Sequence, residues 1–258
     1  SDIIGIGESA LGSNSTANYN IAIGSESLKN NNKPYNIAIG SHSLLNSTDA
    51  EGNISLGNMS MAYQNNPFDN IAIGYLALAG QESSTNIDNS SSAVRNIAIG
   101  IRALNNNSLG QHNIGIGERT LSGNVSGSLN VAIGRLSLTE NNADGNTAVG
   151  YLSLNSNTTG YNNTALGRSV LDSNTTGYAN TAIGEYSMYR NESGKENAAI
   201  GGVSLFSNVD GNANIAVGQG ALYYNTSGSE NAALGYNSLN NNEENYNTGI
   251  GSYAGTSL

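Results

Sequence analysis

A short hydrophobic block recurs from one end of the chain to the other, with the form Asn-(Ile/Thr)-Ala-(Ile/Val/Leu)-Gly-x-x-(Ser/Ala)-Leu. Its central glycine returns every 16 or 17 residues, except across one longer interval between Gly74 and Gly100. A fixed short period is typical of one structural unit stacked on itself. The pattern therefore predicts a single repeat domain over residues 1–258. The central glycines are Gly7, Gly24, Gly40, Gly57, Gly74, Gly100, Gly117, Gly134, Gly150, Gly167, Gly184, Gly201, Gly218, Gly235 and Gly251.

The residues just before each central glycine predict a short β-strand, because they are rich in β-branched types and too short for a helix. Side chains alternate across a strand, so Ile21 and Ile23 share one face while Ala22 points to the other. The same contrast of two large residues and one small residue recurs in the other blocks. A strand with one face in water should alternate apolar with polar residues. We therefore expect both faces of these strands to be covered.

The rest of each repeat predicts a buried leucine followed by a turn. A Leu or Met stands four residues after almost every central glycine, and the two variable positions between them are expected to face solvent. The turns are rich in Asn and Gly, which tolerate left-handed backbone. Two asparagine rows recur at fixed positions, one in the turn (Asn157, Asn174, Asn191) and one before the strand (Asn163, Asn180, Asn197), and we expect them to form hydrogen-bonded ladders.

Stacking of such repeats places equivalent strands in parallel, about 4.8 Å apart. The fold class predicted is all-β: a parallel β-roll or β-solenoid of about 15 coils with 16–17 residues each. A lone roll this thin buries little surface, so either the small-residue row or the isoleucine row is expected to pack against identical chains around an axis. We predict a homotrimer, with a monomeric solenoid left open. Residues 81–94 hold an insertion, either a binding loop or a loop without a role.

The repeat Asn-x-Ala-Ile-Gly-x-x-(Ser/Ala) resembles the head repeats of trimeric autotransporter adhesins, although those heads have a shorter period. The longer repeats, such as residues 163–167 (Asn-Thr-Ala-Leu-Gly) followed by residues 171–177 (Leu-Asp-Ser-Asn-Thr-Thr-Gly), are similar to those of bacteriophage tail-fibre and tail-spike proteins. The first resemblance implies left-handed parallel β-rolls assembled as trimers. The second implies a virion tail fibre, outside the cell.

Composition excludes several other classes. The net charge is −10 and only 9 residues are Lys or Arg, so no basic stripe exists for nucleic acid. No apolar run is long enough to insert into a membrane. The chain has no Cys and 2 His, His42 and His112, in different repeats, so we expect no catalytic site, no metal site and no cofactor. It starts inside a repeat and without a signal-peptide pattern, which predicts a fragment or a processed product.

Tyrosine is the one abundant aromatic residue, with 14 copies. Exposed tyrosines stack on sugars, and they also serve as ordinary packing between coils. As candidate surface glycan contacts we name the residues that follow a central glycine or lie in neighbouring turns. These are Tyr75, Tyr151, Tyr161, Tyr178 and Tyr236.

Together these features predict a non-enzymatic segment of a phage tail fibre that attaches the virion to a host cell. Its expected partners are two further copies of itself, a glycan or protein receptor on the host surface, and other virion tail proteins. The main alternative is the head of a bacterial trimeric adhesin at the cell surface. An ice-binding solenoid has less support, since threonine begins only four strands, at Thr147, Thr164, Thr181 and Thr248. A tail-spike glycan hydrolase would need paired carboxylates, and no pair stands out.

Overall fold

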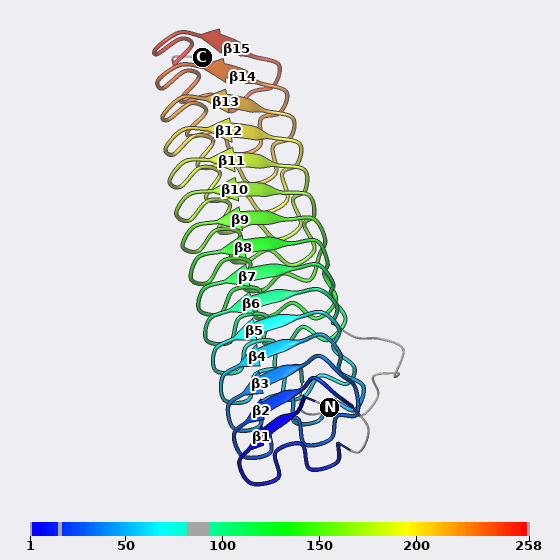
Figure 1. The fold of residues 1–258 in the computed structure, drawn as a ribbon. Helices are drawn as coiled ribbons and strands as arrows, with labels where there is room; N and C mark the ends of the chain where they lie inside the picture. Colours follow the sequence, from blue (N-terminus) through cyan, green and yellow to red (C-terminus); the bar gives the residue numbers. More distant parts are fainter. Residues whose placement is uncertain (1, 15–16, 82–92, 257–258) are drawn as a thin grey trace. The chain divides into compact units, whose positions relative to one another are not determined.

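The computed structural model describes residues 2–14, 17–81 and 93–256. This part of the chain is all-β and contains fifteen strands of three residues and no helix (Figure 1). It forms two compact units, Ser1–Asn130 and Val131–Leu258. The first unit holds β1 (Ile4–Ile6), β2 (Ile21–Ile23), β3 (Ile37–Ile39), β4 (Ile54–Leu56), β5 (Ile71–Ile73), β6 (Ile97–Ile99) and β7 (Ile114–Ile116). The second holds β8 (Val131–Ile133), β9 (Thr147–Val149), β10 (Thr164–Leu166), β11 (Thr181–Ile183), β12 (Ala198–Ile200), β13 (Ile215–Val217), β14 (Ala232–Leu234) and β15 (Thr248–Ile250).

Within each unit the strands stack in chain order, and every recorded pair is parallel and in register (Figure 1). Ala165 at the centre of β10, for example, pairs with Ala148 of β9 and with Ala182 of β11. Each turn of the chain thus advances by one strand, which is the geometry of a β-solenoid. The predicted parallel stack of 16–17-residue coils is confirmed.

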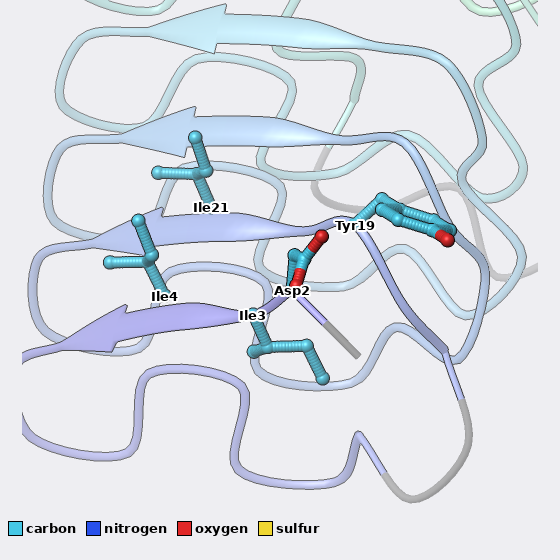
Figure 2. A pocket seen from close by; sticks show the side chains of 5 residues that line it. All are labelled: Asp2, Ile3, Ile4, Tyr19 and Ile21. Atoms are coloured by element: carbon cyan, nitrogen blue, oxygen red, sulfur yellow. The ribbon is translucent and has the colours of Figure 1, made fainter.

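The small residue at the centre of each strand points into its own coil. Ala165, Ala182 and Ala199 are completely buried, as are Leu171 and Met188 from the leucine row. The larger residues at the two ends of each strand point outward, and Figure 2 shows Ile4 and Ile21 extending from β1 and β2. The sequence left open which row meets another chain. In the structure the small-residue row is already buried within the same chain, whereas the isoleucine row is partly exposed.

The buried leucine row has left-handed backbone, which the sequence did not indicate. Leu171, Met188 and Leu205 have φ of 52°, 50° and 50°. The residue two positions before each is also left-handed, as at Tyr186 with φ of 57°. The N–H groups of the two left-handed residues donate to opposite neighbouring coils. The N–H of Tyr186 donates to the carbonyl of Arg168 in the preceding coil (3.0 Å), and the N–H of Met188 donates to the carbonyl of Ser204 in the following coil (2.9 Å). Hydrogen bonds between coils and burial therefore offset the cost of left-handed backbone.

The central glycines are required by close contact between coils. Gly184 has φ of 120°, and a Cβ atom there would lie 2.6 Å from the carbonyl carbon and oxygen of Gly201 in the next coil. Any side chain would push the two backbones apart. Contacts with the glycine of the next coil recur along each unit, as at Gly40 and Gly218, but not at the terminal Gly251, so the glycine row limits how closely the coils stack.

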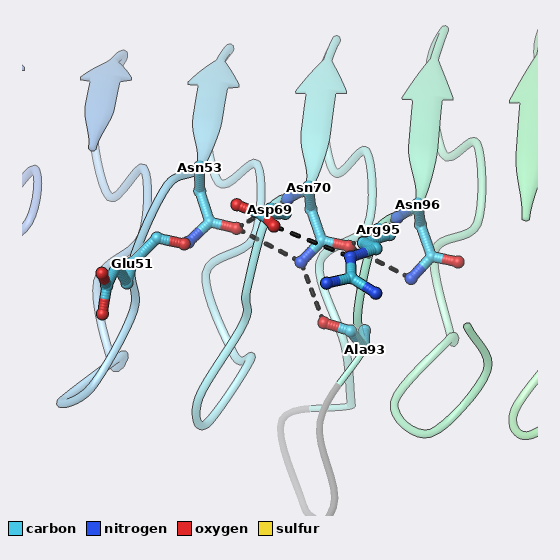
Figure 3. A network of polar contacts seen from close by, with 7 residues as sticks. All are labelled: Glu51, Asn53, Asp69, Asn70, Ala93, Arg95 and Asn96. Atoms are coloured by element: carbon cyan, nitrogen blue, oxygen red, sulfur yellow. Dashed lines mark hydrogen bonds and ion pairs between the residues drawn. The ribbon is translucent and has the colours of Figure 1, made fainter. Parts of the chain in front are cut away.

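The asparagine row before the strands forms a buried ladder of side-chain amides (Figure 3). The Asn70 side chain donates from Nδ2 to Oδ1 of Asn53 (3.2 Å), and Asn96 donates to Asn70 in the same way (3.1 Å). Asn70 also donates from its backbone N–H to Asn53 (3.0 Å) and from Nδ2 to the carbonyl of Ala93 (2.9 Å). Each amide therefore connects adjacent coils through both its donor and its acceptor.

The second asparagine row forms a parallel ladder inside the turns. Asn191 donates to Oδ1 of Asn174 at 2.7 Å, and Asn174 donates to the carbonyl of Gly177 at 3.0 Å. That carbonyl also accepts from Asn163 of the first row (2.8 Å), so one glycine joins the two ladders. Both predicted ladders are confirmed.

Coils of 16 residues interrupt the second ladder. In the coil after Gly235 the Asn242 side chain donates to the carbonyl of Glu244 (2.8 Å) instead of to Asn225. The Oδ1 atom of Asn225 is consequently buried without a hydrogen-bond partner in the described part of the chain. Loss of one turn residue thus moves the amide away from its neighbour.

The predicted insertion at 81–94 lies mostly outside the described residues, but the coils beside it are continuous. Gln64, which stands in the asparagine row, is buried and donates to the carbonyls of Leu78 (3.0 Å) and Asn107 (2.6 Å). Beyond the insertion, Val94 forms parallel bridges with Phe68 and Gln111 on its two sides. The longer glutamine side chain therefore reaches one carbonyl in the coil from which the insertion leaves and a second carbonyl in the coil beyond it.

The left-handed position two residues after the central glycine gives a stability prediction. It is occupied by Val203, Gly220 and Asn237 in three successive coils, with φ of 49°, 67° and 50°. A β-branched residue is unfavourable in this region, whereas Asn is tolerated. We expect Val203→Asn to stabilise the fold by about 1 kcal/mol, measured by chemical denaturation. The reverse change, Asn237→Val, should destabilise it, and a stabilising effect of both changes would contradict this explanation.

Candidate functional surface

The outward face of the strands is a regular surface of the first unit. Both end positions of each strand carry long aliphatic residues there, and they are only partly buried in a single chain. No charged residue interrupts these two rows. They are formed by Ile4, Ile6, Ile21, Ile23, Ile37, Ile39, Ile54, Leu56, Ile71, Ile73, Ile97, Ile99, Ile114 and Ile116. Contiguous exposed apolar patches of this kind mark interaction surfaces.

The corresponding face of the second unit is less apolar. The third strand position remains aliphatic, as at Leu166 and Ile183, but the first position changes to threonine at Thr147, Thr164 and Thr181. Thr164 and Thr181 are exposed. The apolar strip is therefore two residues wide in the first unit and mostly one residue wide in the second.

Three of the predicted glycan contacts lie at the corner that follows the central glycine. Tyr75, Tyr151 and Tyr236 are 45%, 43% and 45% exposed. Tyr75 belongs to the first unit and the other two to the second. Tyr236 packs edge-on against Tyr253 with ring centres 5.2 Å apart. The structure thus exposes these rings, but in separate coils rather than in one cluster.

The other two predicted contacts stack on each other. The ring centres of Tyr161 and Tyr178 lie 4.8 Å apart, and the rings are nearly parallel, with an interplanar angle of 5°. The Lys195 ammonium lies 5.3 Å from the centre of the Tyr178 ring, and its hydrogen bond to the Tyr178 hydroxyl raises the pKa of Lys195. The ring faces that a sugar would need are therefore partly used for packing between coils.

Sequence reasoning missed an aromatic ladder formed by Tyr189, Phe206 and Tyr223. The rings stack at 5.4 Å and 5.0 Å, with interplanar angles of 16° and 2°. Tyr224 extends the cluster edge-on from Tyr223, at 4.6 Å. The signal was present in the sequence, because the three ladder residues are spaced 17 apart, which places them in one column of the stack.

All four basic residues of the second unit lie over aromatic rings. Arg135 lies over Tyr151 (5.9 Å), Arg168 over Tyr186 (5.0 Å) and Arg190 over Phe206 (5.6 Å), in addition to Lys195. Such cation–π contacts orient a charged group without using its hydrogen-bond donors. Arg168 also forms an ion pair with Glu185 at 3.1 Å and a hydrogen bond with the Tyr186 hydroxyl.

His42, which the sequence places at the surface, is part of a small polar group in the first unit. Its Nδ1 atom lies 2.8 Å from Oγ of Ser41, and its Nε2 atom lies 3.5 Å from Glu26. Glu26 also pairs with Lys29 at 2.7 Å, and this hydrogen bond lowers the pKa of the Glu26 carboxyl. All these charged side chains are partly exposed, so water screens their interactions.

The described residues include a hollow of about 470 Å³, and they contain no cluster of three or more potential metal ligands. The hollow is open, and it is lined by Asp2, Ile3, Ile4, Tyr19 and Ile21 beside the outer face of β1 and β2 (Figure 2). The described part of the chain also contains no helix that would span a lipid bilayer.

Comparisons with protein-family models, with curated proteins and with solved structures found no match for this chain.

A half-buried carboxyl group stands next to the aromatic ladder. Asp172 occupies the same coil position as Asn155 before it and Tyr189 after it, and its Oδ1 atom is buried without a hydrogen-bond partner. Burial raises the pKa of the Asp172 carboxyl, and a hydrogen bond with Asn155 opposes this shift. Because the folded pKa exceeds the unfolded one, the stability that Asp172 contributes is present at low pH and is lost as the pH rises through the folded pKa.

We therefore expect Asp172→Asn to raise the thermal midpoint at pH 7, where the charged carboxylate is disfavoured, and to have little effect below the ordinary carboxyl pKa. Asp210→Asn removes an exposed carboxyl from the same unit and controls for the change in net charge. Unfolding scans of the three proteins across pH test this expectation. An equal gain at low and neutral pH would contradict it.

Proposed function

We propose that this chain is a left-handed β-roll segment of a viral tail fibre, assembled as a homotrimer, that attaches the virion to a host cell. The observation that carries the proposal is the pair of outward aliphatic rows on the first unit. A soluble chain does not usually leave such a strip in water. The repeat pattern and its resemblance to fibre and adhesin repeats add the biological setting.

A second copy of the chain is the partner that fits this strip best. The outward rows repeat once per coil, about 4.8 Å apart, and a partner with the same repeat matches them over their whole length. The chain carries a net charge of −10, yet the two rows contain no charge, so identical faces meet without burying like charges. Closed cyclic symmetry is the usual outcome for identical chains, and the resemblance favours three.

The attachment role is supported by the exposed tyrosines and ring-stacked cations of the second unit. They are repeated along the stack, so a trimer would offer several copies of each weak contact, and the contacts would act together through avidity. In this proposal the chain is a non-enzymatic spacer and receptor-binding segment, and its partners are a host surface glycan or protein and other virion tail proteins. The head of a bacterial trimeric adhesin remains the second candidate, because its repeats resemble the Asn-x-Ala-Ile-Gly block, although their period is shorter.

If the chain assembles through the outward rows of the first unit, an aspartate at the first strand position should disrupt the trimer in the first unit but not in the second. Ile71 and Thr164 both stand at the first position of a strand and point outward. Ile71→Asp would place a charge in the proposed contact, where burial without a partner is unfavourable, so we expect loss of the trimer. Thr164→Asp should leave it intact. Light-scattering mass, with circular dichroism as a fold control, measures both; a monomeric wild-type chain would overturn the assembly proposal.

The attachment part is tested by binding of the fluorescently labelled chain to a panel of bacterial strains. We expect binding to a subset of strains and weaker binding of the Ile71→Asp protein, because avidity falls when copies separate. Protection of those strains from a phage whose tail genes encode this chain distinguishes a fibre from an adhesin. Absence of binding to every strain that this phage infects would contradict the role in attachment.

A further inference from the structure

Arg190 differs from the other basic residues of the second unit. Arg168 is paired with Glu185, and Lys195 with the Tyr178 hydroxyl. For Arg190 the described part of the chain shows no ion pair with a carboxylate, although the unit contains ten acidic and four basic residues. Its side chain is exposed. An unpaired guanidinium in an acidic unit is therefore available to an anionic ligand.

The aromatic ladder holds this guanidinium in place. The Arg190 guanidinium carbon lies 5.6 Å from the centre of the Phe206 ring. Phe206 is itself fixed between Tyr189 and Tyr223 in the stack. Because a cation–π contact uses no N–H donor, the planar fork of Arg190 keeps its donors for a ligand. A pre-oriented group loses less entropy on binding than a free surface side chain.

An exposed aromatic ring stands two coils away in the same column. The backbone N–H groups of Arg190, Ser207 and Tyr224 donate to Phe206, Tyr223 and Asn240 in the following coil, so the three donors share one coil position. Arg190 and Tyr224 are therefore about 10 Å apart along the stack. Ser207 between them is small and only 7% exposed, whereas Tyr224 is 53% exposed. No large side chain of that column separates the cation from the ring.

We propose that Arg190 and Tyr224 form a binding site for a carboxylated sugar residue within a glycan chain. A carboxylate pairs with the planar guanidinium through two parallel hydrogen bonds. The apolar C–H face of the adjoining pyranose packs on the Tyr224 ring, whose hydroxyl stays in water. This site deepens the proposed attachment role by naming the chemistry of the receptor, and it rests on that role for its biological meaning.

Calorimetric titration of the whole chain with three probes tests the site: tetragalacturonate, a glucuronate-containing hyaluronan tetrasaccharide, and sialyllactose. We expect at least one to bind, and its methyl ester, which has the same rings without the charge, to bind about tenfold more weakly. Arg190→Gln and Tyr224→Ala should each weaken binding by about tenfold or more. Arg168→Gln, a matched change at another ring-stacked arginine, should change it by less than about twofold.

Circular dichroism of each variant checks the fold, since all three side chains lie at the surface. The proposal is overturned if none of the three acids binds at about 10 mM, if acid and ester bind equally, or if Arg190→Gln binds like the wild type. Its failure is separable from failure of the attachment role. Binding of the acids without binding to cells would support the site and contradict attachment. Binding to cells, with no effect of Arg190→Gln on sugar binding, would support attachment and contradict the site.

Discussion

The structure depends on the register between coils, and buried asparagine amides maintain it. An amide at one coil position accepts from the coil on one side and donates to the coil on the other, as Asn70 does between Asn53 and Asn96 (Figure 3). A shift of one residue would leave several buried amides without partners, and each unpaired polar group would be costly. The ladders therefore favour one alignment of the coils and disfavour all neighbouring ones. The glycine contacts between coils, such as Gly184 on Gly201, require the same alignment.

This register also explains the surfaces. The coil interior is filled by asparagine amides, small strand residues and one leucine, so larger aliphatic side chains at the strand ends remain outside. Because every coil repeats the same positions, like residues align in columns. Aromatic residues become a stack (Tyr189, Phe206 and Tyr223), and cations lie over rings in the adjacent coil. Residues of one type that recur at the same coil position therefore form an extended stripe along the unit.

The sequence was sufficient to predict the period, the parallel strands, the buried leucine row and both asparagine ladders, because each depends on residue type at a fixed position. It could not predict which strand face was internal, since alanine and isoleucine faces are both apolar. It also did not reveal the left-handed backbone of Leu171 or Met188, because leucine and methionine disfavour that region and only contacts between coils select it. The Gln64 bridge depends on the neighbouring insertion and has no local signal.

Prediction of the candidate surface was less complete. Exposure of Tyr75, Tyr151 and Tyr236 agrees with their position after the central glycine. The stacking of Tyr161 on Tyr178 follows from their 17-residue spacing, because residues one coil apart lie in one column of the stack. The aromatic ladder and the position of Arg190 also depend on such columns, which the properties of single residues do not reveal. Glycan binding by these residues stays a prediction.

Hydrogen exchange of asparagine side-chain amides, followed by NMR, measures whether the ladders hold the coils in register. We expect the carboxamide protons of buried ladder residues, such as Asn180 and Asn174, to exchange only when the stack unfolds, whereas those of the exposed Asn162 exchange rapidly. Rapid exchange at the ladder residues in the folded chain would show that the amides do not maintain the register.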